Sequence, residues 1–291
     1  MNELFDHLRT QLRQVYSEGE ARAVAFWLME EAFGVSRTDI YADKVRQFSQ
    51  DERERLDNMC KQLVEEQQPV QYVVGHEWFL GRQFRVTSDV LIPRPETEEL
   101  VNWAVEKTKK CQHPRPIIMD AGTGSGCIAV SLALALPEAE VSAIDLSEGA
   151  LAVARENAEK LGARVHFQKA DMLQPWDFLI QNRVSTSQKI DLIVSNPPYI
   201  CQREAAEMEQ NVLRNEPHTA LFVPDDDPLR FYRALAREAM LHLRPAGWLL
   251  VEINRAYGHE TAHLFEEMGL KNVEIRKDSF GNERMVAGQR A

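Results

Sequence analysis

The stretch that most constrains the fold begins after Pro116. The apolar run Ile117–Met119 is followed by the glycine-rich segment Asp120–Gly126 and then by the helical run Cys127–Leu136. A buried strand, a glycine-rich turn and a helix form the first unit of a doubly wound α/β sheet. In such a sheet, ligands bind outside the carboxyl ends of the strands. The sequence therefore predicts a Rossmann-like parallel sheet with a ligand crevice at that edge.

The glycine-rich turn predicts close contact between backbone and ligand. Gly122, Gly124 and Gly126 alternate with Thr123 and Ser125, so the spacing is Gly-x-Gly-x-Gly and not the Gly-x-Gly-x-x-Gly of dinucleotide-binding folds. Glycine lets the backbone approach a ligand, and the N-terminus of the following helix points its N–H groups at an anionic group. The turn suits an amino-acid moiety at least as well as a pyrophosphate.

Two acids follow the next predicted strands. The strand Val141–Asp145 ends in Asp145, which is placed to bind ribose hydroxyls, although it would also suit a cap for the next helix. The strand Val165–Phe167 is followed by Asp171 and Met172. We expect Asp171 to accept a hydrogen bond from an adenine amino group and Met172 to cover the ring. The alternative is an ordinary turn acid and a core methionine.

A proline-stiffened corner follows the fourth predicted strand. The apolar run Ile190–Val194 leads into Asn196, Pro197, Pro198 and Tyr199. The two prolines fix φ and remove two N–H donors, so the corner displays carbonyl oxygens beside the Asn196 carboxamide and a flat ring. Two fixed acceptors can grip both N–H bonds of a planar NH2 group, either a carboxamide or a nucleobase amino group. The alternative is a rigid turn whose tyrosine packs on the core.

Composition narrows the class of protein. The 291 residues are 44% hydrophobic and 27% charged, as in globular proteins, and the net charge of -11 disfavours a broad phosphate-binding surface. No apolar run approaches the ~18 residues of a membrane helix, and the N-terminus lacks the apolar core of a signal peptide. We therefore expect a cytoplasmic protein with reduced thiols and neither a zinc site nor a disulfide framework, because the four cysteines form no C-x-x-C pair: Cys60, Cys111, Cys127 and Cys201.

The first part of the chain predicts a separate helical domain. Apolar residues from Leu4 to Tyr16 recur at helical spacing, Ala21–Phe33 predicts a second helix, and Pro69 ends the pattern. Because residues 1–70 contain no glycine-rich loop or ligand cluster, we interpret them as a domain for substrate recognition.

Residues 71–95 predict a β-hairpin linker. Gln71–Gly75 and Trp78–Val86 alternate in polarity and contain turn glycines. Arg94 lies between two prolines, in a segment that we expect near the ligand crevice, the alternative being a simple linker. A helix opens directly after it, with Thr97 as a candidate cap.

Together these motifs resemble a known family. The Asp-x-Gly-x-Gly-x-Gly turn, the ribose acid and Asn-Pro-Pro-Tyr are similar to those of class I S-adenosylmethionine-dependent methyltransferases acting on amino groups. The segments Ile92–Glu98 and Glu216–Leu221 and the small helical domain narrow the resemblance. They resemble the family that methylates the glutamine side-chain amide in the Gly-Gly-Gln motif of peptide chain release factors, a step that serves translation termination.

The resemblance implies a seven-stranded class I methyltransferase domain at residues 96–291. It implies S-adenosylmethionine as cofactor, release factors as partners, and no metal, membrane or direct nucleic-acid contact. The cofactor residues would be Gly122, Thr123, Gly124, Ser125, Gly126, Asp145, Asp171, Met172 and Asn196. Asn196 and the Pro197 carbonyl would accept the amide hydrogens while Tyr199 packs on the amide plane, making these three the catalytic residues. The substrate would be bound by Asn196, Pro197, Pro198 and Tyr199.

Three other functions share parts of this pattern. An adenine or cytosine amino methyltransferase uses the same corner, but the net charge and the absence of a basic, aromatic-interleaved stretch count against it. A nicotinamide-dependent oxidoreductase would require the other glycine spacing, and a binding module would bind the cofactor without turnover. The chain also departs from the family pattern in three places: Met172 replaces a frequent aromatic residue, Asp225–Pro228 replaces a glycine-rich segment, and Asn254 replaces a common glycine.

Overall fold

A computed structural model of the chain describes residues 3–43, 48–111, 113–176 and 189–291. The chain divides into two compact units. The first, here called the helical unit, comprises residues 1–76 and 208–215. The second, here called the sheet unit, comprises residues 77–207 and 216–291.

The helical unit confirms the predicted helices. Ser17, Ser36 and Ser49 each start a helix with a capping box, and Gly34 ends the second helix in the left-handed conformation. The apolar faces of these helices meet in one core. The unit contains α1 (Glu3–Leu12), α2 (Glu18–Phe33), α3 (Arg37–Tyr41), α4 (Gln50–Val64), α5 (Val70–Val74) and α10 (Gln210–Asn215).

The prediction of a strand at Gln71–Gly75 was wrong, because these residues belong to one turn of helix, α5, and to its cap. Pro69 precedes the helix, and Gly75 ends it at a φ of 89°, with its N–H bonded to the Gln71 carbonyl. The hairpin itself is present, one segment later, as β1 (His76–Phe79) and β2 (Arg82–Arg85).

The main sheet of the sheet unit has the order β10-β11-β9-β6-β3-β4-β5 within the described residues. Its strands are β3 (Ile117–Ala121), β4 (Glu140–Asp145), β5 (Val165–Lys169), β6 (Ile190–Ser195), β9 (Leu243–Glu252), β10 (Lys271–Lys277) and β11 (Glu283–Gln289). The five strands from β9 to β5 are parallel, and β11 is antiparallel to both of its neighbours. Because the strand order reverses between β3 and β6, the crevice of this fold is expected outside their carboxyl ends.

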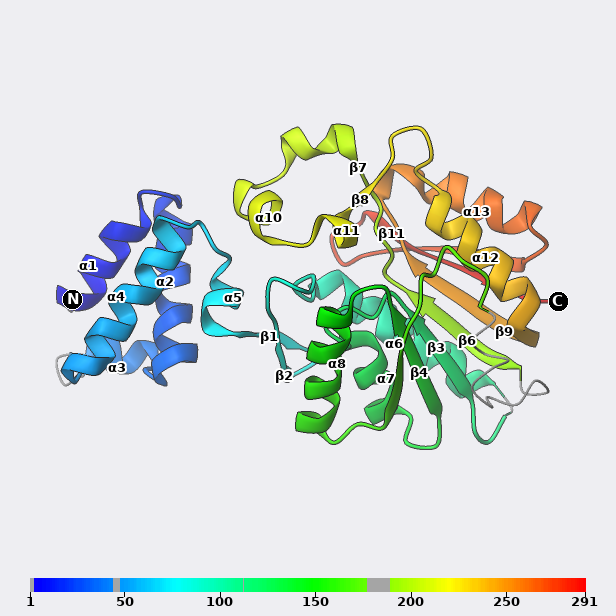
Figure 1. The fold of residues 1–291 in the computed structure, drawn as a ribbon, viewed down its shortest axis with the longest axis horizontal. Helices are drawn as coiled ribbons and strands as arrows, with labels where there is room; N and C mark the ends of the chain where they lie inside the picture. Colours follow the sequence, from blue (N-terminus) through cyan, green and yellow to red (C-terminus); the bar gives the residue numbers. More distant parts are fainter. Residues whose placement is uncertain (1–2, 44–47, 112, 177–188) are drawn as a thin grey trace. The chain divides into compact units, whose positions relative to one another are not determined.

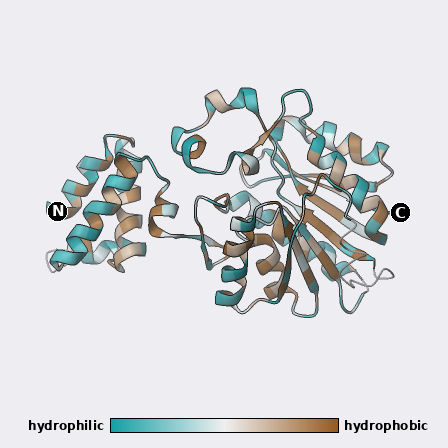
Figure 2. Ribbon diagram, viewed as in Figure 1, coloured by the Kyte–Doolittle hydropathy of each residue, from teal (hydrophilic) through white to brown (hydrophobic). Residues whose placement is uncertain are grey.

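Helices cover both faces of the main sheet (Figure 1). One face packs against α6 (Pro95–Lys110), α7 (Cys127–Ala135) and α8 (Glu148–Leu161), and the other against α12 (Arg230–His242) and α13 (Gly258–Glu267). Figure 2 shows the central strands as mostly hydrophobic and the helices as amphipathic, with hydrophobic and hydrophilic residues on the same helix. Strands buried on both faces read as continuous apolar runs, which explains why β3 and β6 could be recognised in the sequence.

Short elements alternate between β6 and α12: β7 (Ile200–Cys201), η2 (Gln202–Glu207), α10, α11 (His218–Leu221) and β8 (Phe222–Val223). One further expectation, that of Thr97 as a helix cap, differs from the structure. Thr97 does not cap α6, because Arg94 is the N-cap residue and Pro95 occupies the first turn. In the part of the chain that the structure describes, no helix is long and apolar enough to cross a bilayer.

Candidate functional site

A cavity of about 570 Å³ lies at the carboxyl ends of β3, β4 and β6, and is here called the strand-end cavity. Its lining includes Asp145, Asp171, Met172, Asn196 and four residues of the glycine turn, Gly122, Thr123, Gly124 and Ser125. The predicted cofactor residue Gly126 is the N-cap of α7 and does not line the cavity. All of its lining residues belong to the sheet unit. Gly122 and Asn196, which are 74 positions apart in the sequence (196 minus 122), therefore share one cavity, as the strand-end pattern predicts.

The glycine turn is held from inside the protein by Asp120. Its Oδ2 accepts hydrogen bonds from Thr123 Oγ1 at 2.6 Å and from Ala129 N at 3.2 Å, and burial raises its pKa to about 7. Gly122 has a φ of 75°, and an added Cβ would lie 2.5 Å from Met172 Cε. Glycine is therefore required there both by the backbone conformation and by the close approach of Met172.

Asp145 serves the start of α8 and lines the cavity at the same time. Its Oδ1 accepts from Ser147 N and its Oδ2 from Gly124 N, both at 2.9 Å. Burial raises the pKa of this carboxyl. A carboxylate has about four acceptor positions, so these backbone bonds do not use all of them.

Asp171 and Met172 lie at the end of β5, on the cavity wall. Asp171 Oδ1 accepts from Leu173 N at 2.9 Å, which fixes the loop. Met172 packs its methyl group against Gly122, so it bounds the cavity beside the glycine turn.

The proline corner presents different residues to different sides. Asn196 and Pro198 line the strand-end cavity, and Pro197 is buried. Tyr199 is not among the lining residues; its ring packs on the core behind, and its hydroxyl donates to Glu252 Oε1 at 3.2 Å. Asn254 Nδ2 donates to the Tyr199 carbonyl at 3.2 Å, so this departure from the family's glycine anchors the corner.

Arg94 lies at the cavity, as expected, and its partner there is Glu216. Arg94 Nη2 lies 2.6 Å from Glu216 Oε1, and Glu216 Oε2 accepts from Ile92 N at 3.3 Å. The side chain of Glu216 is only 1% exposed. The segments Ile92–Glu98 and Glu216–Leu221, which narrowed the resemblance in the sequence, are thus joined by an ion pair whose carboxylate is buried.

Sequence reasoning missed Glu252 as a member of the site. It ends β9, and its carboxylate accepts from Thr97 Oγ1 at 2.7 Å as well as from Tyr199. Burial raises its pKa to about 7, against the two hydroxyl donors and Arg284. The signal was present, because Glu252 is an acid directly after an apolar strand, as Asp145 is.

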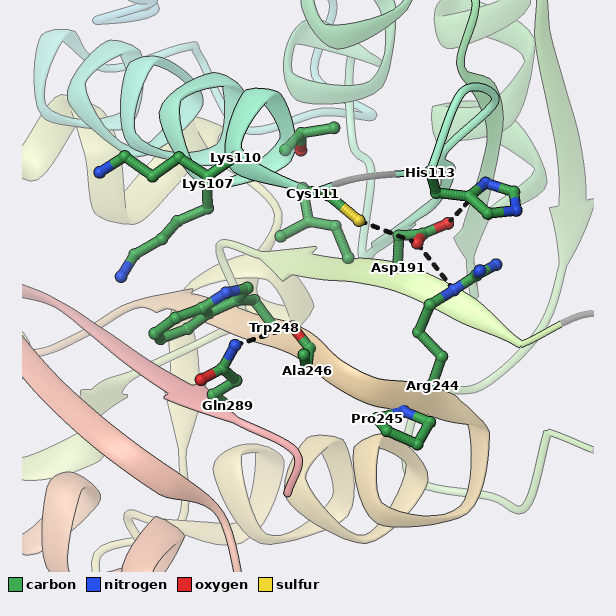
Figure 3. Close-up of a pocket in the computed structure, with 12 residues that line it drawn as sticks. Lys107, Lys110, Cys111, His113, Asp191, Arg244, Pro245, Ala246, Trp248 and Gln289 are labelled. Atoms are coloured by element: carbon green, nitrogen blue, oxygen red, sulfur yellow. Dashed lines mark hydrogen bonds and ion pairs between the residues drawn. The ribbon is translucent and has the colours of Figure 1, made fainter.

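A second cavity, here called the rear cavity, has a volume of about 580 Å³ and lies at the amino ends of β6 and β9 (Figure 3). Buried Asp191 accepts from Cys111 Sγ and Ile117 N and pairs with Arg244. Lys107 pairs with Glu274 and lies over the Trp248 ring. Because these charges are paired within the protein and the cavity lies away from the carboxyl ends of the strands, the strand-end cavity is the better candidate. Among the described residues, no group of three or more histidines, cysteines, aspartates or glutamates is arranged to hold a metal ion.

Comparison with protein families matches both parts of the chain. Residues 3–75 match the PrmC N-terminal domain, and residues 113–252 match a methyltransferase domain. The first match covers most of the helical unit, and the second covers the glycine turn and the proline corner.

Comparison with individual proteins gives the same result. The chain is 42% identical to the release factor glutamine methyltransferase of Bacteroides thetaiotaomicron, over 100% of both chains. It is 39% identical to that of Flavobacterium psychrophilum, over 97% of this chain and 98% of the other. Among solved structures, the hMettl16 catalytic domain in complex with an RNA hairpin has a TM-score of 0.56 at 15% identity, covering 83% of this chain and 82% of the other. That last similarity shows the class I methyltransferase fold.

Proposed function

This chain belongs to the family of release factor glutamine methyltransferases, and we propose that it transfers a methyl group from S-adenosylmethionine to the side-chain amide of the glutamine in the Gly-Gly-Gln motif of a release factor. The observation that carries this proposal is the shared cavity of the glycine turn and Asn196, which brings a cofactor site and an amide acceptor together.

The residues of the strand-end cavity fit S-adenosylmethionine. A volume of about 570 Å³ lies within the usual range of ligand pockets. Two acceptors that line the cavity, Asp145 and Asp171, suit ribose hydroxyls and an adenine amino group, and the start of α7 suits a carboxylate. When bound, the cofactor supplies an electrophilic methyl group carried on a sulfonium.

The proline corner compensates for the weak nucleophilicity of an amide nitrogen. Asn196 and the Pro197 carbonyl accept the two amide hydrogens and orient the nitrogen, which is catalysis by positioning and preorganised electrostatics. Pro198 completes the cavity wall, whereas Tyr199 lies outside the lining and holds the corner to Glu252, so the expected packing of its ring on the amide plane is not part of this proposal. Because a neutral methylated amide remains once the proton leaves, the residues need supply no strong base.

We further propose that the helical unit recognises the release factor. Its apolar faces are used in its own core, and the cavity is built by the sheet unit. This division leaves the surface of the helical unit for a macromolecular partner.

Mass spectrometry of a purified release factor, incubated with this protein and S-adenosylmethionine, tests the function. We expect one added methyl group on the peptide that contains the Gly-Gly-Gln motif, and none on a release factor in which that glutamine is replaced. A methylated RNA or DNA with an unmodified release factor would contradict the proposal.

A further inference from the structure

A chain of three hydrogen bonds lies behind the Asn196 carboxamide. Asn196 Nδ2 donates to Thr97 Oγ1 at 3.1 Å, and Thr97 Oγ1 donates to Glu252 Oε2 at 2.7 Å. Tyr199 OH donates to the other oxygen of Glu252 at 3.2 Å. Thr97 and Glu252 are 2% and 1% exposed, so water does not compete for these bonds.

The donor and acceptor roles in these hydrogen bonds are fixed by the buried Glu252 carboxylate. An ionised carboxylate carries no proton, so the Thr97 hydroxyl must donate its single proton to Glu252. The Thr97 oxygen can then only accept, and the Asn196 group facing it has to be the NH2. The Asn196 oxygen is thereby turned away from Thr97.

We propose that Thr97 and Glu252 are positioning residues, which hold the Asn196 carboxamide in the one orientation that offers its oxygen to the substrate amide. This inference rests on the proposed function. In the opposite orientation Asn196 would present N–H donors to the N–H donors of the glutamine, and no hydrogen bond would form. A flipped carboxamide would therefore lose the acceptor on which the corner depends.

The ionisation of Glu252 governs whether these donor and acceptor roles hold. Besides Thr97 and Tyr199, the groups that act on it electrostatically are Arg284 on β11, Glu96 on α6, Tyr232 on α12 and Cys127 at the start of α7. Burial is the largest influence and raises the pKa of Glu252 to about 7. A protonated Glu252 can donate to Thr97, which frees the Thr97 proton for the Asn196 oxygen. Turnover should therefore decline as the pH falls through the Glu252 pKa.

The chain offers matched variants for a test. Thr97→Val keeps the shape and removes the hydroxyl, whereas Thr97→Ser keeps the hydroxyl. Thr108→Val makes the same change on the same helix, where the buried hydroxyl donates to the Ala104 carbonyl. The assay is methyl transfer to a full-length release factor, with kcat and KM measured separately.

We expect Thr97→Val to lower kcat by about tenfold, the effect of losing one oriented hydrogen bond in the transition state, with KM changed less than about threefold. Thr97→Ser and Thr108→Val should stay within about threefold of the parent protein. The kcat profile should have an acidic limb centred near the Glu252 pKa, and Glu252→Gln should remove that limb and lower the plateau. A Thr97→Val protein with the parent kcat and acidic limb would overturn the inference.

A second readout does not depend on turnover. The side-chain amide signal of Asn196, assigned in a nitrogen-15 NMR spectrum by its loss in Asn196→Asp, reports on the partner of its NH2 group. We expect it to titrate with Glu252 in the parent protein and to lose that titration in Thr97→Val. An Asn196 signal that changes neither with pH nor on Thr97→Val would refute the positioning role of Thr97 and Glu252. An inactive parent protein with the expected NMR response would refute only the proposed function.

Discussion

Removing Arg94 alone is expected to lower the free energy of unfolding more than removing Arg94 together with the charge of Glu216. Glu216 is 1% exposed and relies on two partners, Arg94 at 2.6 Å and Ile92 N at 3.3 Å. In Arg94→Leu a buried carboxylate would keep only the weaker, backbone bond. A buried charge stripped of its partner typically costs 3–5 kcal/mol, so we expect about 3 kcal/mol, the low end, because Arg94 itself is 33% exposed.

The double variant Arg94→Leu with Glu216→Gln separates charge from shape. The carboxamide oxygen that replaces the carboxylate can still accept from Ile92 N, while the buried charge is gone. Replacing a buried ion pair by groups without charge is often nearly neutral, so we expect the double variant to recover about half or more of the loss. Glu216→Gln alone should lower the free energy of unfolding only slightly, because Arg94 still has an acceptor and partial access to water.

Hydrogen exchange at residues 90–97 and the urea midpoint of the four proteins measure these differences, and cofactor titration reports the consequence at the strand-end cavity. We expect faster exchange and weaker cofactor binding in Arg94→Leu, with both partly restored in the double variant. If the double variant were as unstable as the sum of the two single variants, the ion pair would be acting through packing and not through an unpaired buried charge.

Three further predictions follow from the site. Asn196→Ala should abolish most methyl transfer but leave cofactor affinity within about threefold, as measured by turnover and calorimetry. Gly122→Ala should weaken cofactor binding and cost about 1–2 kcal/mol for its positive φ, and Met172→Ala in the same protein should relieve the added contact at 2.5 Å without relieving the backbone strain. For Glu252, whose folded pKa of about 7 exceeds its ordinary 4.5, the folded state binds the proton more tightly, so stability is lost as the pH rises between those values. Relative to Glu252→Gln, the parent protein should lose up to about 3 kcal/mol across that window in urea unfolding, and parallel curves would refute this.

The parts of the site that the sequence predicted are those encoded locally. A buried parallel strand is a continuous apolar run, and the residues that follow it lie at one edge of the sheet, so Asp145 and Asn196 could be placed without any long-range information. The glycine spacing similarly predicted a tight turn, and in the structure Gly122, Gly124 and Gly126 have positive φ.

The parts that the sequence did not predict depend on which groups meet across the fold. Thr97 reads as a cap in the sequence, yet its hydroxyl bonds a carboxylate 155 residues away (252 minus 97). Gln71–Gly75 alternates like a strand, but Pro69 before the helix and the left-handed Gly75 that caps it decide for a helical turn. Tyr199 reads as an aromatic wall for a substrate, and the position of Glu252 turns its hydroxyl to the core. The local sequence pattern suggests a structural element or a role for each of these residues, but it does not identify the residue that each contacts in the fold.

The beginning of α6 joins two different functions through neighbouring side chains. Pro95 fixes the first turn, so Arg94 and Thr97, three positions apart, project in set directions. Arg94 lines the cavity and pairs with Glu216, whereas Thr97 orients Asn196. Loss of Arg94 should therefore appear mainly as weaker cofactor binding, and loss of the Thr97 hydroxyl mainly as a lower kcat. If Arg94→Leu and Thr97→Val instead changed cofactor affinity and kcat in the same ratio, the start of α6 would be acting as one rigid support. Neither side chain would then have the separate role that its hydrogen bonds indicate.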